Sequence, residues 1–157
     1  VGLVGSVPTG REVMRAAADT IKPVSLELGG KNALIAYPDA DAIQVAKASV
    51  SGMNFTKSAE QSCGSTSRIF VHAAIYEATL AAILEGVRAI RMGLPTDPKS
   101  EMGCLVDQVQ FDKVLDLIES GPVEGARLVA GGELVAQALV DGGARGGEAS
   151  KLGIGGR

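Results

Sequence analysis

The sequence predicts an α/β fold, and three features indicate it. Apolar runs of four or five residues alternate with longer segments whose apolar residues recur every third or fourth position. Glycine and proline separate these segments. With 157 residues, of which 46% are hydrophobic and 21% charged, the chain can bury a core. We therefore expect strands and helices to alternate over residues 1–133.

Composition excludes several classes of function. A net charge of −3 argues against a nucleic-acid or anionic membrane surface, and 3% aromatic residues without tryptophan argue against base stacking. No run approaches the roughly 20 apolar residues of a membrane span. The two cysteines and the lack of a signal-like segment indicate a reducing compartment, so we expect a cytoplasmic protein. Because the chain opens with Val1 inside an apolar run, it has the character of an internal fragment.

The first unit should be a strand, a glycine turn, a helix and a second parallel strand. We expect the strands at residues 1–4 and 24–28 and the helix at residues 8–21. Ser6 is a suitable N-cap, and Pro8 suits a first turn. One face of this helix should carry Val13, Ala17 and Ile21.

The glycine turn between Gly5 and Gly10 opens a helix, and helix N-termini attract phosphate. It is not a P-loop, because Arg11 and Glu12 follow Gly10 where Lys and Ser or Thr would be needed. Its spacing also differs from G-x-G-x-x-G. On the residues alone, a phosphate site and a plain tight turn both remain open.

The later elements follow from the same periodicities. We expect strands at residues 33–37, 68–72 and 127–130, and helices at residues 42–53, 75–92 and 107–120. Asp41 can cap the second helix, and Gly121 should stop the last one. The inner face of the helix at 42–53 should carry Val45, Ala46, Ser49, Val50 and Met53.

Two segments lack periodicity. Residues 54–67 form a long loop around Cys63, and such loops on a rigid frame are where binding and catalysis concentrate. Residues 134–157 hold seven glycines and no aromatic residue, which predicts a poorly ordered tail.

Cys63 and Glu27 are the candidate chemical groups. A thiol attacks a carbonyl only after losing its proton, and a carboxylate at the end of an apolar strand, buried between Leu26 and Leu28, could take that proton or activate a water. Backbone N–H groups around Cys63 could stabilise the developing oxyanion. The structural alternatives are a cysteine that only packs and a solvated strand-end glutamate.

The other reactive side chains are expected to be structural. His72 ends a strand without a partner pattern, and Cys104 should pack near a loop. Two cysteines 41 residues apart and one histidine do not have zinc-ligand spacing, so we predict no metal site.

Three motifs resemble the aldehyde dehydrogenase superfamily. Residues 26–33 (LELGGKNA) are similar to its glutamate motif, and residues 61–68 (QSCGSTSR) to its cysteine motif. Residues 5–10 (GSVPTG) resemble its nucleotide turn. Further similar positions follow in order at residues 102–103, 124–126 and 131–132, so the resemblance covers residues 1–133.

The resemblance implies a Rossmann-like nucleotide-binding piece joined to part of a second α/β catalytic domain. The NAD(P)-binding piece would be residues 1–30, the catalytic part residues 31–133, and the tail residues 134–157. Gly5, Ser6 and Gly10 would lie at the pyrophosphate of NAD or NADP, with Leu28 and Gly29 near the nicotinamide. The whole protein would be a homo-oligomer.

The resemblance also implies a reaction. Cys63 would attack an aldehyde to give a thiohemiacetal, hydride would pass to NAD(P)+, and the resulting thioester would be hydrolysed by a water that Glu27 activates. The alternatives are a CoA-acylating semialdehyde dehydrogenase and a non-catalytic nucleotide-binding or structural relative.

The sequence departs from the family pattern next to the nucleophile. Glu60 stands where the family usually has glycine, and Lys57 where an aromatic residue is common. Val4 replaces an aromatic residue before the glycine turn. Because the family's oxyanion asparagine and most cofactor contacts lie outside the matched region, we expect the chain alone to lack activity. The residues that would select the aldehyde, or NAD over NADP, lie outside it too.

Overall fold

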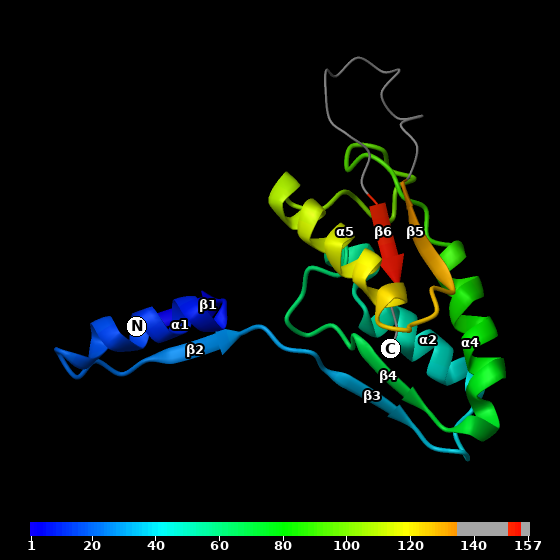
Figure 1. Cartoon of the computed structure of the whole chain (residues 1–157), viewed down its shortest axis with the longest axis horizontal. Coiled ribbons are helices and arrows are strands. Elements are labelled where there is room, and N and C mark those ends of the chain that lie inside the picture. Colours follow the sequence, from blue (N-terminus) through cyan, green and yellow to red (C-terminus); the bar gives the residue numbers. More distant parts are fainter. Residues whose placement is uncertain (135–150, 155–157) are drawn as a thin grey trace.

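The computed structural model describes residues 1–134 and 151–154 and has two regions, joined by one extended segment (Figure 1). The arm, residues 1–29, consists of β1 (Gly2–Gly5), α1 (Val7–Ala18) and β2 (Ser25–Leu28). The body, from residue 30 onward, contains β3 (Ala33–Ala36), α2 (Ala42–Gly52), α3 (Phe55–Ser58), β4 (Arg68–Val71), α4 (Ala73–Arg88), α5 (Gln108–Val123), β5 (Ala130–Leu134) and β6 (Lys151–Ile154). The α/β class is therefore confirmed.

The described strands pair two by two. β1 and β2 are parallel, β3 and β4 are parallel, and β5 and β6 are antiparallel. A helix crosses between the partners of each parallel pair, which confirms the unit predicted for residues 1–28. None of the hydrogen bonds between described residues crosses from the arm to the body.

The arm follows the predicted order. The Ser6 hydroxyl caps α1 by accepting from the N–H of Thr9 at 3.3 Å, which confirms the predicted cap. Ala17 is buried as expected. The prediction for Ile21 is wrong, because α1 ends at Ala18 and Ile21 adopts a φ of 47° with 91% of its surface exposed.

In the body, α2 and α4 pack against each other beside the β3–β4 pair (Figure 1). A Cβ at Gly86 would lie 3.1 Å from Val50 Cγ2, so the two helices approach closely there. The Asp41 carboxylate caps α2 by accepting from the N–H of Gln44 at 2.8 Å. The predicted inner face of α2 is confirmed, because each of its five residues is buried or half-buried.

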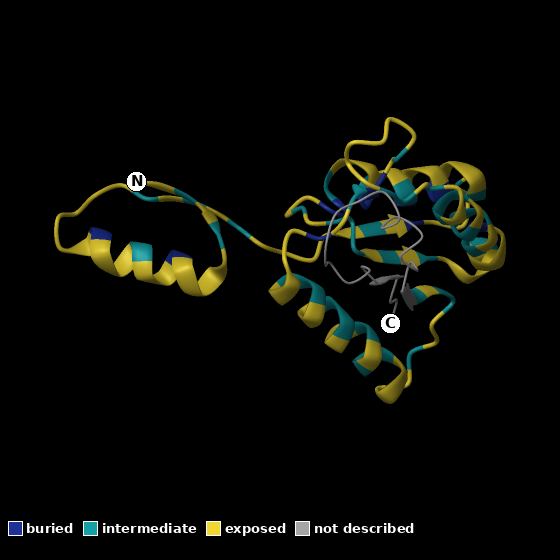
Figure 2. Ribbon diagram, turned by 90° about the horizontal axis from the view of Figure 1, so that it is seen from above, coloured by how far each residue is buried: buried dark blue, intermediate teal, exposed yellow. Residues whose placement is uncertain are grey.

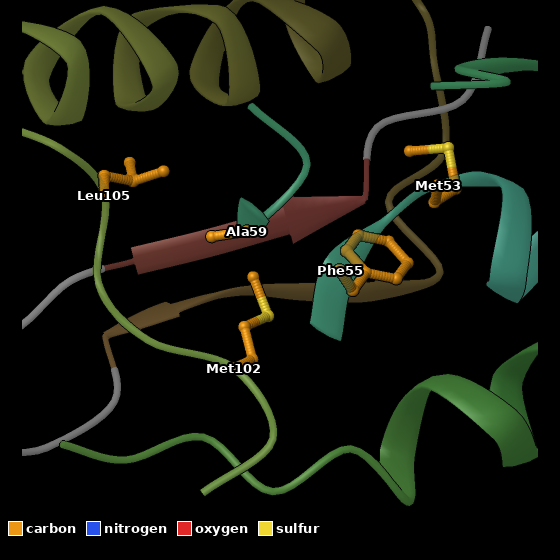
Figure 3. Packing of buried hydrophobic residues seen from close by; sticks show 5 residues of the cluster. All are labelled: Met53, Phe55, Ala59, Met102 and Leu105. Atoms are coloured by element: carbon orange, nitrogen blue, oxygen red, sulfur yellow. The ribbon is translucent and has the colours of Figure 1, made fainter. Parts of the chain in front are cut away.

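A cluster of buried hydrophobic residues surrounds α3 and the turn before α5. Figure 3 shows its members, which are Met53, Phe55, Ala59, Met102 and Leu105. By contrast, Figure 2 shows an arm that is mostly exposed. The segment leading to Cys63 therefore begins within this buried cluster.

Several predicted boundaries need correction. The predicted loop at residues 54–67 contains α3, and α4 ends at Arg88 rather than near Met92, which pairs with Met102 in an isolated bridge. α5 continues through Gly121 and Pro122 to Val123, because the left-handed glycine that ends it is Gly125, with a φ of 92°.

The last strands also differ from the prediction. β5 begins at Ala130, where the predicted strand ends. β6, at residues 151–154, lies within the predicted tail and pairs antiparallel with β5, and the poor order of that tail stays a prediction. The rest of that predicted tail, residues 135–150 and 155–157, lies outside the described residues.

Candidate active site

The carboxyl ends of β1 and β2 bring most of the predicted cofactor residues together. In the parallel register, Gly5 pairs with Leu28, so Ser6 and Gly29 follow at the same edge of the arm. A Cβ at Gly29 or Gly30 would meet no atom within 4 Å, so the space around them is open. Ligands of open α/β sheets bind at such an edge, and the N-terminus of α1 lies there as well.

Gly10 lies apart from this edge. It is buried in α1, and its N–H donates to the Ser6 carbonyl at 2.9 Å. A Cβ at this position would come within 3.1 Å of Leu28 Cδ2 and 3.4 Å of Leu26 Cδ1. The absence of a side chain at Gly10 therefore lets α1 pack closely on β2, and contact with a pyrophosphate stays a prediction.

Glu27 is exposed, which corrects the expectation of a buried carboxylate. Leu26 and Leu28 are half-buried beneath α1 near Gly10. Because side chains alternate across a strand, Glu27 lies on the opposite face of the β1–β2 pair. No described element covers that face, on which Val4, the register partner of Glu27, is 78% exposed.

Cys63 lies in a tight, hydrogen-bonded loop of the body. The N–H of Ser65 donates to the Ser62 carbonyl at 3.2 Å, and the N–H of Gly64 donates to Ser62 Oγ at 3.2 Å. The thiol is free and exposed. Within residues 61–66, the N–H of Cys63 alone donates to no described acceptor.

Side chains from three places fix this loop to the body. Ser65 is buried, and its Oγ donates to the Met53 carbonyl at 2.9 Å. Gln61 joins two segments, because its Nε2 donates to the Ser58 carbonyl at 3.1 Å and its Oε1 accepts from the N–H of Val106 at 3.0 Å. From the segment after β2, Asn32 Nδ2 donates to the Cys63 carbonyl at 2.9 Å.

Thr66 completes the attachment at the end of α2. Its N–H donates to the Gly52 carbonyl at 3.0 Å. A Cβ on Gly52 would overlap the Thr66 hydroxyl oxygen, so a larger residue there would force the Thr66 side chain to move. The Thr66 hydroxyl itself is buried without a partner among the described residues.

Glu60 enters this loop as a half-buried carboxyl group. Burial raises its pKa above the ordinary value, and the positive charge of Lys31 partly opposes that rise. Its φ of 65° and the φ of 49° at Ala59 lie in the left-handed region, which favours glycine. Lys57 is exposed on α3.

A cavity of about 580 Å³ lies beside this loop. Lys31, Glu60, Gln61 and Ser67 line it, together with side chains from α2, α4 and α5. The Ser67 hydroxyl is buried there and has no partner among the described residues. Cys63 is not one of its lining residues, so we do not assign this cavity to the aldehyde.

The remaining candidates are as follows. His72 Nδ1 accepts from the N–H of Ala74 at 3.2 Å and caps α4, which agrees with the predicted structural role. Cys104 is exposed, so the prediction that it packs is wrong.

Across residues 1–134 and 151–154, we find neither a group of three potential metal ligands nor a helix able to span a membrane.

The predicted site residues lie in two regions of the structure. Four predicted residues, Gly5, Ser6, Leu28 and Gly29, lie at one edge of the arm, whereas Cys63 lies in the body. No hydrogen bond between described residues joins Glu27 to the cysteine loop. Sequence reasoning missed Asn32, although it lies inside the glutamate motif, because a side-chain amide carries no periodic signal.

The comparisons with known proteins agree with one another. The aldehyde dehydrogenase family profile matches residues 1–144. Aldehyde dehydrogenase tropH of Talaromyces stipitatus is 53% identical over 133 residues, which cover 84% of this chain and 26% of that protein. A betaine aldehyde dehydrogenase of Cereibacter sphaeroides is 51% identical over 133 residues, covering 85% of this chain and 27% of that protein. The chain spans about a quarter of the length of these relatives.

Solved structures give the same result. An aldehyde dehydrogenase variant from Bacillus cereus superposes with a TM-score of 0.84 at 33% identity, over 99% of this chain and 29% of that one. An NAD+ complex of aldehyde dehydrogenase from Bacillus cereus gives a TM-score of 0.83 at 35% identity, over 96% of this chain and 29% of that one.

Proposed function

Because this chain belongs to the aldehyde dehydrogenase family, we propose that Cys63 and Glu27 are the nucleophile and base of an NAD(P)-dependent oxidation of an aldehyde to a carboxylic acid. One observation carries the proposal. Cys63 has an exposed thiol and a free backbone N–H in a loop whose neighbouring N–H groups are all hydrogen-bonded. A nucleophile and a nearby donor for the developing oxyanion are the two groups that attack on a carbonyl needs.

The chain's own residues carry most of the reaction. The Cys63 thiolate adds to the aldehyde carbon, and the oxygen of the resulting thiohemiacetal lies within reach of the Cys63 N–H. NAD(P)+, when bound at the carboxyl edge of the arm, would supply the hydride acceptor that the change from thiohemiacetal to a thioester on Cys63 requires. Glu27 then takes a proton from the attacking water, and the acid and the free thiol are released.

The carboxyl edge of the arm suits a dinucleotide. Gly5, Ser6, Leu28 and Gly29 meet there, and the open space beside Gly29 and Gly30 leaves room for a ligand. These residues would hold the cofactor against the N-terminus of α1. Gly10, which packs on Leu26 and Leu28, would contribute by keeping α1 close to β2.

The proposed base has to act close to Cys63. Asn32, which contacts the cysteine loop, lies five positions after Glu27, so the path between them spans at most about 18 Å. A base acts only within hydrogen-bond distance or through one water. Rotation at Gly29 and Gly30 can bring the exposed carboxylate toward Cys63, because neither glycine has a close neighbour outside the adjoining chain.

A specific observation supports a second candidate, a non-catalytic relative. Glu60 holds a left-handed backbone conformation where glycine is favoured, and its half-buried carboxyl group lies in the loop that carries Cys63. Both features could deform the loop. If this candidate is correct, Glu60→Gly will raise the reactivity of Cys63, whereas an intact site will show little change.

The test measures alkylation of each thiol by iodoacetamide against pH, with the exposed Cys104 as internal control. We expect Cys63 to react several-fold faster than Cys104 near neutral pH, and Glu27→Gln to slow Cys63 alone. Glu12→Gln, an equivalent change at an exposed carboxylate of the arm, is the matched control. Equal, slow labelling of both thiols in the wild type would refute an activated nucleophile.

We further expect the 157-residue chain alone to form no NADH from an aldehyde, because Glu27 is exposed and no described contact holds it against the cysteine loop. An aldehyde-dependent rise in NADH absorbance from the purified chain would contradict this. The homo-oligomer and the cytoplasmic location stay predictions.

A further inference from the structure

The side chain of Asn32 lies between the two motifs. Asn32 follows the two glycines after β2, and its Nδ2 donates to the Cys63 carbonyl at 2.9 Å and to the Ser65 carbonyl at 3.4 Å. A side-chain amide carries two N–H hydrogens, so one Asn can serve two carbonyls. Carbonyls two residues apart reach one donor only when the chain between them is turned, so Asn32 favours the turned form of the loop.

Arg68 attaches the same segment to the other end of the loop. Its N–H donates to the Asn32 carbonyl at 3.1 Å, and its Nε donates to the Lys31 carbonyl at 3.0 Å. Residues 31–32 are therefore bonded to residues 63, 65 and 68. The glutamate motif and the cysteine motif, separated in sequence, share one hydrogen-bonded structure.

We propose that Asn32 is a positioning residue that holds the Cys63 loop in the form that leaves the Cys63 thiol and N–H free. This inference deepens the proposed function and rests on it for the role of Cys63. The contacts made by Asn32 occupy the carbonyls of Cys63 and Ser65, and the loop's other N–H groups bond to Ser58, Glu60, Ser62 and Gly52. Loss of the amide frees both carbonyls and lets the loop unwind.

Amide hydrogen exchange tests the positioning itself. Ser65 and Thr66 donate the N–H bonds that define the turn and its attachment, so their exchange rates report whether the loop is formed. We expect Asn32→Ala to raise both rates at least about fivefold, while the amides of α4 keep theirs. Asp41→Ala, which removes the cap of α2 and touches no residue of the loop, is the matched control and should leave Ser65 and Thr66 unchanged.

Asn32→Asp separates hydrogen bonding from side-chain shape. Aspartate has nearly the same shape but no donor when ionised, so it should behave like alanine at neutral pH. A protonated carboxyl group can donate again, so protection of Ser65 and Thr66 should partly return in this variant below about pH 4. Asn32→Ala should show no such recovery, and a residue with only a packing role would not produce this pH profile.

Thiol labelling of the same samples separates the two proposals. We expect the ratio of Cys63 to Cys104 labelling in Asn32→Ala to move toward the ratio in urea, while Asp41→Ala keeps the wild-type ratio. Unchanged loop exchange in both Asn32 variants, or equal acceleration in the loop and in α4, would overturn the positioning role. A third outcome combines faster loop exchange in Asn32→Ala with a Cys63 to Cys104 labelling ratio that is the same in the folded wild type as in urea. That outcome supports the positioning role of Asn32 and refutes Cys63 as an activated nucleophile.

Discussion

The arm and the body each carry one motif on the same kind of unit, a parallel pair of strands crossed by a helix, yet they hold it differently. In the arm, Glu27 is exposed, and the buried residues of α1 are Gly10 and Ala17. In the body, the loop that carries Cys63 follows a buried hydrophobic cluster, and side-chain hydrogen bonds of Asn32, Gln61 and Ser65 hold it in place. The loop of the candidate nucleophile is thus formed by its own region, whereas the position of the candidate base depends on how the arm is oriented.

The largest expected effect comes from removing the packing under the loop. Phe55 is 2% exposed in the central cluster, so Phe55→Ala should lower the free energy of unfolding of the body by about 3–5 kcal/mol. Phe70→Ala is the control, because Phe70 is 52% exposed and its loss should cost under about 1 kcal/mol. Urea unfolding measures both, and equal losses would mean that the cluster does not support the body.

A smaller loss should follow from crowding the loop's attachment. A Cβ on Gly52 would overlap the Thr66 hydroxyl and lie 3.4 Å from Thr66 Cβ, so Gly52→Ala should cost about 1–3 kcal/mol. Gly29→Ala, at a position with no atom within 4 Å, should cost far less. If the two variants unfold at the same urea concentration, Thr66 adjusts freely and the attachment is weaker than its geometry indicates.

A cap in each region tests whether the arm and the body are independent. Ser6→Ala should remove about 1 kcal/mol from α1, and Asp41→Ala a similar amount from α2. Hydrogen exchange should show each loss in its own helix only, because no hydrogen bond between described residues crosses from the arm to the body. Faster exchange of α2 amides in Ser6→Ala would show coupling that the described contacts do not provide.

The smallest effect should be a pH dependence that belongs to the body. Burial raises the pKa of Glu60, so folding favours its protonated form. Its contribution to stability is fully present below the ordinary carboxyl pKa of about 4.3, and it is lost as the pH rises through the raised value. Relative to Glu60→Gln, the wild type should therefore lose stability across that interval. Parallel curves of urea midpoint against pH would contradict the burial of this carboxyl group.

Features that depend only on residues close together in the sequence could be predicted. The caps at Ser6 and Asp41 and the inner face of α2 follow from side-chain chemistry and helical spacing, and all three are confirmed. The end of α5 did not follow, because Gly121 and Gly125 are equally suitable in sequence and only the backbone conformation selects Gly125.

The exposure and the contacts of the candidate site residues could not be predicted from the sequence. Two flanking leucines indicated burial of Glu27, but strand alternation places it opposite them, on a face that no described element covers. The hydrogen bonds of Asn32 and Gln61 reach across 31 and 45 residues, so no short motif contains both partners. The candidate nucleophile could be proposed from its motif, whereas its supporting contacts could not.

The lack of close neighbours around Gly29 and Gly30 has a practical consequence. Exposed glycines without close neighbours are preferred sites for proteolytic nicking. A cut there would release a 29-residue peptide that carries Glu27, and would leave Asn32, Cys63 and Arg68 on the larger product. The two products, one with the candidate base and one with the candidate nucleophile, could then be purified separately and mixed again. Titrating one with the other would measure the affinity between them.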